Sequence, residues 1–227
     1  WTSQPKFLTG LSSEFARPTF AFNAATGLVD IVANAAITKS NVTTKPSTAG
    51  VGLQTTATGT NDGIYTLSSL AADTTPFSVL IVVKIGAVSG DVGLFQWAGS
   101  TGATGSPHAL IKNTTGNLQI YGASSGYVAT QTGVLTAGSV HSIVLTFDGA
   151  KAYLCRNGQM TSAVGPWIGA GAVKTHAWFD NGFNTVDTGN AVYAGAIWSG
   201  KALSVAKALA LSRNPWQVFQ PLARNVY

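Results

Sequence analysis

Charged residues are scarce in this sequence. Asp, Glu, Lys and Arg make up 9% of its 227 residues, whereas soluble domains carry roughly 25%. The polar surface must therefore come from Ser, Thr, Asn, Gln and backbone amides, which excludes coiled coils and charge-rich helical bundles. An apolar fraction of 45% with a net charge of +5 also excludes a disordered chain. The basic residues are scattered singly, so the sequence offers no basic patch and predicts no nucleic-acid partner.

Long apolar runs are absent as well. The longest, Val79–Val83, is followed by Lys84, and a membrane-spanning helix needs roughly 20 apolar residues. We therefore expect no insertion into a membrane. The first residues, Trp1–Lys6, lack the basic and apolar regions of a secretory signal.

Cysteine is almost absent. The single Cys155 cannot form an internal disulfide and lies in the alternating run Lys151–Arg156, which predicts a buried, unreactive thiol. Scarce cysteine also fits a protein that is assembled in a reducing cytoplasm.

Residues for catalysis are few. Glu14 is the only glutamate and the aspartates are dispersed, so the carboxylate pair of a glycoside hydrolase is not visible. There is no Gly-x-Ser-x-Gly motif between a strand and a helix. His108, His141 and His176 lie in unrelated strand-like segments, and each is interpreted as a surface residue or a structural residue with its hydrogen bonds satisfied. The sequence therefore predicts that the protein is not an enzyme.

Short β patterns separated by Gly, Ser, Thr and Asn are abundant. The β-branched run Phe77–Ile85 predicts a central strand covered on both faces. In His141–Phe147, alternation places Ile143, Leu145 and Phe147 on one face and the intervening residues on the other. Further strands are expected at Phe20–Asn23, Gly63–Leu67, Val92–Trp97, His108–Lys112, Leu118–Tyr121 and Ala191–Trp198.

Turn residues define a three-stranded segment. Asn157-Gly158 predicts a type I′ hairpin, because both central positions need a positive φ. Asp148-Gly149 predicts a second reversal, so the strand through Phe147 should lead into one over Lys151–Arg156 and a third from Gln159. The stretch from Thr43 to Thr60 is expected to be loop or edge strand.

One helix is expected near the C-terminus. Ser204 is a suitable N-cap for Val205–Leu211, and Asn214-Pro215 should end the helix. Many short antiparallel strands with one late helix predict an all-β protein, an antiparallel β-sandwich of jelly-roll type with one short C-terminal helix. We expect one domain over residues 1–227, with an irregular segment over about 1–20 and an aromatic tail over about 214–227.

Four segments resemble a known family. Pro76–Val79, Leu135–Gly149, Ala152–Gly158 and the closing Ala196–Ser204 are similar to concanavalin A-like, laminin-G-like jelly rolls, in which a strand ending in Phe-Asp-Gly precedes an Asn-Gly hairpin. The ending Leu211–Pro221 resembles such domains in tailed-bacteriophage proteins, and the likeness covers roughly residues 60–221. It implies a non-enzymatic structural protein on the exterior of a tailed-phage virion, a capsid decoration or a tail appendage, assembled in the host cytoplasm.

The virion interpretation predicts a homo-oligomer that also contacts other virion proteins. Its aromatic tail should supply the contacts between subunits, with Trp216, Phe219 and Tyr227 in an exposed apolar patch. The tail prediction depends on these rings being exposed in the single chain.

The alternative is a free carbohydrate-binding, lectin-like module, and a host surface glycan is a partner compatible with both interpretations. Sugars bind to aromatic faces beside short polar side chains, a mixture found after the strand-like segment that ends at Trp178. We expect Tyr127 and Trp97 to join this site across the sheet, although most aromatic residues in a sandwich belong to its core. The candidate glycan-binding residues are Trp178, Phe179, Asp180, Asn181, Phe183 and Tyr121.

No cofactor is expected from the residues themselves. Laminin-G-like domains often hold Ca²⁺ at a loop rim, so the resemblance makes a calcium site conceivable, and its ligands would include Asp180 and Asp187. The favoured interpretation is that the Asp and Asn residues of this segment form turns.

Overall fold

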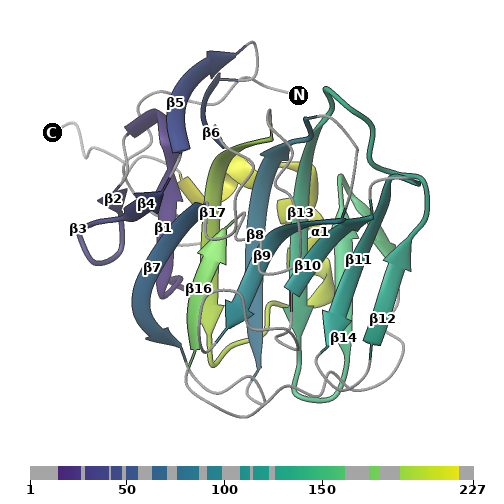
Figure 1. The fold of residues 1–227 in the computed structure, drawn as a ribbon. Helices are drawn as coiled ribbons and strands as arrows, with labels where there is room; N and C mark the ends of the chain where they lie inside the picture. The colour runs from purple at the N-terminus through teal and green to yellow at the C-terminus, as the bar shows by residue number, and fades with distance from the viewer. Residues whose placement is uncertain are drawn as a thin grey trace, which may run out of the picture.

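The computed structural model describes residues 15–26, 29–40, 42–47, 50–55, 63–70, 76–86, 91–98, 108–112, 115–122, 126–161, 174–178 and 190–219. These residues form an antiparallel β-sandwich of two large sheets with one short α-helix, as the sequence predicts (Figure 1). The seven-stranded sheet lies in front in Figure 1, and the helix lies behind the other sheet.

The eight-stranded sheet has the strand order β15-β14-β13-β8-β17-β6-β5, and β1 also pairs with β17. Its strands are β1 (Phe20–Asn23), β5 (Val42–Ser47), β6 (Gly50–Thr55), β8 (Phe77–Lys84), β13 (Val140–Phe147), β14 (Ala152–Arg156), β15 (Gln159–Thr161) and β17 (Ala191–Ser199).

The seven-stranded sheet has the order β12-β11-β10-β9-β16-β7-β4. Its strands are β4 (Thr38–Ser40), β7 (Gly63–Leu70), β9 (Asp91–Ala98), β10 (His108–Lys112), β11 (Asn117–Gly122), β12 (Gly126–Gln131) and β16 (Lys174–Trp178). A separate hairpin pairs β2 (Val29–Asp30) with β3 (Ala35–Ala36), and the 3-10 turn η1 spans Ala24–Thr26.

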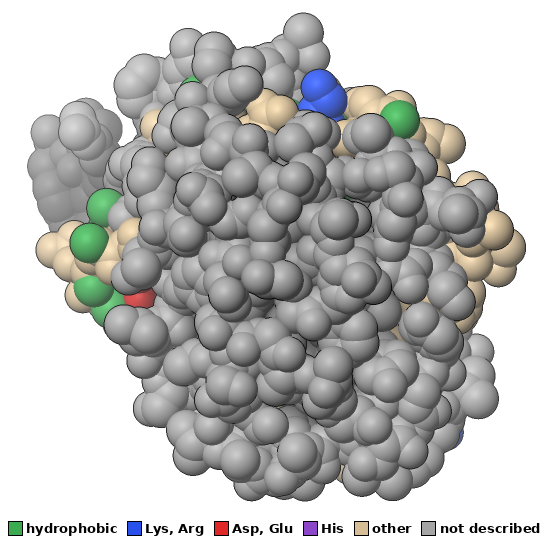
Figure 2. Space-filling view, in the orientation of Figure 1, with side chains coloured by type: hydrophobic (Ala, Val, Ile, Leu, Met, Phe, Trp, Pro, Cys, Tyr) green, Lys and Arg blue, Asp and Glu red, His purple; other side chains and the backbone are tan. Residues whose placement is uncertain are grey.

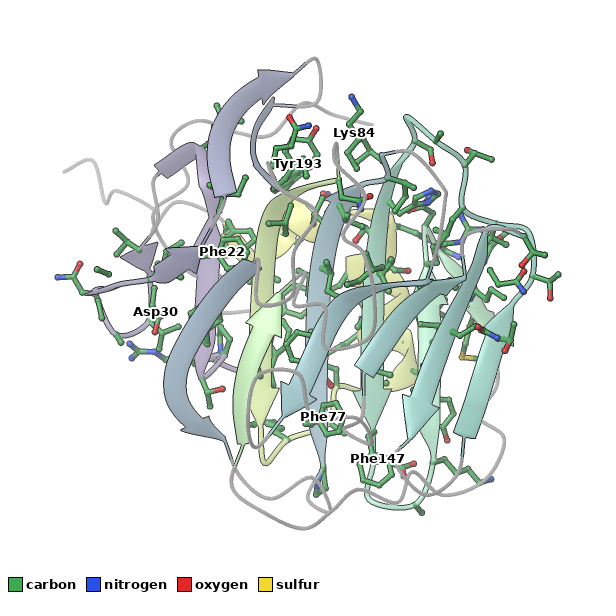
Figure 3. All side chains as sticks on the ribbon, viewed as in Figure 1. Phe22, Asp30, Phe77, Lys84, Phe147 and Tyr193 are labelled. Atoms are coloured by element: carbon green, nitrogen blue, oxygen red, sulfur yellow. The ribbon has the colours of Figure 1, made fainter. Side chains whose placement is uncertain are left out.

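The main core lies between the two sheets and is built on β8, a central strand with both faces covered. Val79, Ile81 and Val83 alternate into this core, and β13 contributes Ile143, Leu145 and Phe147, as its alternation predicts. Figure 3 shows Phe77 beside Phe147, the pair that β8 and β13 place in register, with ring centroids 5.8 Å apart. The period of two in these strands therefore separates two apolar faces.

A second apolar cluster covers the outer face of the eight-stranded sheet. There Leu80, Val82 and Val144 lie against the helix α1 (Val205–Arg213) and the 3-10 turn η2 (Pro215–Phe219). Ser204 caps α1 as predicted, because its side chain accepts a hydrogen bond from the Lys207 amide.

Buried hydroxyl groups fix this helical cover to the sheet. Ser78 Oγ lies 2.7 Å from Thr146 Oγ1 and accepts the Leu203 amide at 2.8 Å. Thr146 Oγ1 lies 3.1 Å from the Leu203 carbonyl oxygen, to which it donates. Ser142 donates to the Leu211 carbonyl at 3.3 Å. Small polar residues on the outer face of β8 and β13 thus satisfy backbone groups just before α1, at Leu203, and near its end, at Leu211.

The turns follow the sequence. Asn157 and Gly158 have φ values of 48° and 82°, and β14 pairs with β15 across them, as a type I′ hairpin requires. At the other reversal, the Asp148 carboxylate accepts the amides of Ala150 and Lys151 at 2.8 and 2.7 Å, and the pKa of Asp148 is lowered by these backbone hydrogen bonds.

Two sequence expectations are resolved by the packing. Cys155 is buried, and burial raises its pKa to about 11, so the expected unreactive thiol is confirmed. The stretch from Thr43 to Thr60, expected as loop or edge strand, contains most of β5, which lies at the edge of its sheet, and also β6, which pairs with both β5 and β17.

The expected exposure of the tail is wrong for two of its three residues. Trp216 is 6% exposed and Phe219 is fully buried, because η2 folds back over the second apolar cluster of its own chain. Both rings are therefore used inside the chain, with centroids 6.4 Å apart. Tyr227 lies outside the described residues.

Large hydrophobic side chains are almost all covered in the described part of the chain. Met160 is the one that is exposed there. On the face drawn in Figure 2, hydrophobic atoms gather at the left edge over the β2–β3 hairpin, where Ala35 and Ala36 are exposed.

Candidate functional site

The structure describes only the backbone of two residues of the predicted glycan site. Tyr121 lies in β11 and Trp178 ends β16, and their side chains are outside the description. The other predicted residues, Phe179, Asp180, Asn181, Phe183 and Asp187, lie outside the described residues. The grouping of this loop therefore stays a prediction.

Strand register connects Tyr121 to a line of residues that runs across the whole seven-stranded sheet. Tyr121 pairs with Tyr127 on one side and with His108 on the other. On each further strand, the next member is the residue that pairs in register with the member on the previous strand. We call this line the tyrosine row; from β12 to β4 it contains Tyr127, Tyr121, His108, Gln96, Ala177, Tyr65 and Thr38.

The tyrosine row lies on the outer face of the seven-stranded sheet, the face directed away from the other sheet. The residues directly before Tyr121, Gln96 and Thr38 all belong to the core between the sheets, and they are Ile120, Phe95 and Ile37. Because neighbouring residues in a strand alternate between faces, the row occupies the opposite face. Direct cross-strand partners share a face, so the assignment extends over the row.

The same register separates the predicted aromatic residues. Trp178 is the register partner of Phe95, and Trp97 that of His176; both tryptophans are thus placed on the core-facing side of the sheet, opposite Tyr121 and Tyr127. Sequence reasoning grouped Trp97 with Tyr121 and Tyr127, a grouping that stays a prediction because the structure describes only the backbone of these residues. It also missed Tyr65, because no local pattern shows that β7 pairs with β16.

The row beside the tyrosine row contains Thr130, Gln119, Leu110 and Gly93. Gln119 lies two residues before Tyr121 in β11, and its side chain is only 6% exposed. Its Nε2 donates to Thr130 Oγ1 at 3.2 Å, whereas its buried Oε1 accepts no hydrogen bond from any described residue. Tyrosine rings, amides and an imidazole on one face are the groups that stack on and hydrogen-bond to sugars.

A second polar cluster lies at the margin between the two sheets. Ser139 Oγ is 2.7 Å from His141 Nε2, and His141 Nδ1 lies 3.4 Å from Arg156 Nη1 and 3.2 Å from Asn157 Nδ2. Arginine and amide nitrogens only donate, so Nδ1 accepts, Nε2–H donates to Ser139, and Ser139 donates to the Thr136 carbonyl.

This arrangement makes His141 a structural residue. Burial, and then the charge of Arg156, lower the pKa of His141 from 6.5 to about 4. A histidine held neutral in this way is a poor general base for the neighbouring hydroxyl. The expectation of a structural histidine with satisfied hydrogen bonds is confirmed at this position.

The described part of the chain has neither a cluster of metal ligands nor a membrane-spanning helix. No three His, Cys, Asp or Glu side chains gather there as metal ligands; the residues expected to bind calcium, Asp180 and Asp187, are outside it. None of its helices has the length and apolar character of a membrane span.

Comparisons with known proteins identify similar folds. No model of a known protein family matches the sequence, and no curated protein matches it. The structure is similar to Trypanosoma rangeli sialidase in complex with sialic acid, with 14% identity and a TM-score of 0.65, over 94% of this chain and 37% of the sialidase. This chain thus spans little more than a third of that protein.

Two other solved structures are similar over shorter chains. Domain 4 of AbnA, a GH43 extracellular arabinanase from Geobacillus stearothermophilus, in complex with arabinotriose, has 16% identity and a TM-score of 0.61, over 87% of this chain and 98% of that one. The HCR/D F1240A mutant has 14% identity and a TM-score of 0.63, over 87% and 51%. Likeness at such identities shows the fold alone.

One sequence prediction is corrected by these comparisons. The chain was expected not to be an enzyme, yet its fold matches parts of sialidases, which are enzymes. A β-sandwich with few carboxylates is therefore no ground for excluding an activity. The sequence reasoning failed because it inferred function from missing motifs, and a fold does not fix a function in either direction.

Proposed function

We propose that this chain is a carbohydrate-binding module whose ligand lies on the outer face of the seven-stranded sheet. The observation that carries the proposal is the tyrosine row, in which register brings Tyr121 and Tyr127 together and places Tyr65 on the same face. Aromatic faces stack on the C–H surfaces of sugars. His108 and Gln96 lie between the tyrosines and supply hydrogen-bonding groups.

The similar structures give independent support. Domain 4 of AbnA is a complete chain in complex with arabinotriose, and this chain matches 98% of it. Because that match is a whole domain bound to an oligosaccharide, it supports sugar binding by a module of this size and fold. The sialidase match covers only 37% of that protein, so it leaves open which part of the sialidase acts on its substrate.

The test is calorimetric titration of the chain with a glycan panel that includes arabinotriose. Tyr121→Ala should weaken the best ligand at least about tenfold, which corresponds to about 1.4 kcal/mol. Tyr153→Ala is the matched control, because Tyr153 is half-buried in β14 of the other sheet and hydrogen-bonds to Asp148. Equal affinity of Tyr121→Ala and the parent chain would refute the site.

The loop proposed from the sequence gives a competing site. If residues 179–183 bind the glycan, Asn181→Ala should weaken binding and Tyr121→Ala should not. Trp178 is the register partner of Phe95, a residue of the core between the sheets, and this pairing supports the tyrosine row over a stacking site built on that tryptophan.

The finer prediction, a structural protein on the exterior of a tailed-phage virion, rests on the sequence resemblance. A glycan-binding module is compatible with a virion component that touches its host. Subunit contacts through Trp216 and Phe219 are disfavoured by their burial, so an assembly would use other residues. Light scattering tests this prediction: a stable symmetric oligomer supports it, and a monomer at all concentrations opposes it.

A further inference from the structure

On the outer face of the seven-stranded sheet, the charged residues that strand register assigns to this face balance one another. One row of this face contains Asn117, Lys112 and Asp91 as successive partners. The lysine and the aspartate are therefore neighbours of opposite sign. The tyrosine row itself has no carboxylate, lysine or arginine among its members. Recognition of an acidic sugar needs a fixed cation, preferably Arg, facing its carboxylate, and this row has none.

The tyrosine row is also long. Tyr127 and Tyr65 lie on strands five spacings apart in the sheet, a span of roughly 24 Å at about 4.8 Å per spacing. An extended sugar residue is about as long as one strand spacing, so the aromatic ends of the row are separated by about five sugars. A single terminal sugar would use one end and leave the other empty.

The row is not flat. Adjacent strands in a sheet are rotated by roughly 20°, so the surface turns by about 100° between Tyr65 and Tyr127 if this rotation accumulates over five spacings. A twisted surface fits one flexible chain and does not fit the planar face of a crystalline polymer. Ala177, the smallest side chain of the row, is the register partner of Tyr65.

We infer that the ligand is a single, neutral, unbranched glycan chain that lies across the strands along the tyrosine row, with about one sugar on each strand. This inference rests on the proposed function and adds the class of its ligand. Tyr121 and Tyr127 form one aromatic platform, and Tyr65 forms a second at a distance that only a chain of several sugars bridges.

The experiment is titration of the chain with arabino-, xylo- and cello-oligosaccharides of two to seven sugars, with oligogalacturonides of the same lengths as acidic probes. In at least one neutral series, affinity should rise at least tenfold between two and six sugars and then level off. The oligogalacturonides should bind at least tenfold more weakly. Crystalline cellulose should retain none of the protein.

Two substitutions test the contribution of each end of the row to binding. Tyr65→Ala should leave the affinity for disaccharides unchanged and remove the gain from the longer members of the series. Tyr121→Ala should weaken every length. Affinity that is the same for two and six sugars, or acidic probes that bind as well as neutral ones, would overturn the linear-chain inference while the proposed function stands. Absence of binding to any glycan, including the panel used above, would instead refute the proposed function, and the inference with it.

Discussion

The two sheets differ in what lies on their outer faces. The eight-stranded sheet presents Leu80, Val82 and Val144 outward, and α1 and η2 of the same chain bury them. The seven-stranded sheet presents tyrosine, histidine and glutamine along one register row, and no described helix covers it. The apolar outer face is thus buried within the fold, whereas the outer face that carries the tyrosine row is the one on which we propose that a ligand binds.

Removing the helical cover should have the largest effect. Phe219→Ala deletes a fully buried ring from η2 and should lower the free energy of unfolding by about 3–5 kcal/mol. Urea denaturation measures this loss. Met160→Ala, at an exposed position, should change stability by less than about 0.5 kcal/mol. A loss for Phe219→Ala that depends on protein concentration would show that the ring acts between subunits.

Acid should lower the stability of the fold through His141, which lies at the margin between the sheets. The pKa of His141 is about 4 in the fold and 6.5 in the unfolded chain, so the unfolded chain binds more protons between these values. The stabilisation is complete above pH 6.5 and is lost as the pH falls to about 4; its size is about 3 kcal/mol. Urea denaturation at pH 7 and pH 4.5 tests this, with His141→Gln as the variant without a titrating ring. The same pH dependence in both proteins would contradict the assignment.

Replacing either of two glycines should have the smallest effect on stability. The comparison tests how closely α1 packs against the turn at Gly158. Gly158 and Gly200 both have positive φ, at 82° and 74°, so alanine at either should cost about 1 kcal/mol. A Cβ at Gly158 would lie 2.5 Å from Arg213 Cγ, whereas nothing lies within 4 Å at Gly200. Gly158→Ala should therefore be the more destabilising in thermal melts. Equal losses would mean that Arg213 moves away freely.

Much of the eight-stranded sheet could be predicted from sequence because its signals are local. The apolar run of β8, the alternation of β13 and the Asn157-Gly158 turn each act within a few residues. Helix α1 is likewise marked by Ser204 at one end and Pro215 at the other.

The tyrosine row could not be predicted because pairing between distant strands creates it. Residue 65 meets residue 177, and residue 96 meets residue 108; no local pattern encodes these partners. Bulges add to the difficulty: the register of β9 with β10 shifts after Ala109, so Leu94 and Phe95 both enter the core. A simple alternation through β9 therefore assigns faces wrongly.

The most direct test of the central claim is backbone-amide NMR of the chain titrated with arabinohexaose, cellohexaose and xylohexaose. Sugar binding on the outer face of the seven-stranded sheet predicts that shift changes concentrate at Tyr65, Gln96, His108, Tyr121 and Tyr127, and that the amides of α1 stay unchanged. Changes confined to residues 179–189 or to α1, or no change with any of the three sugars, would contradict the account.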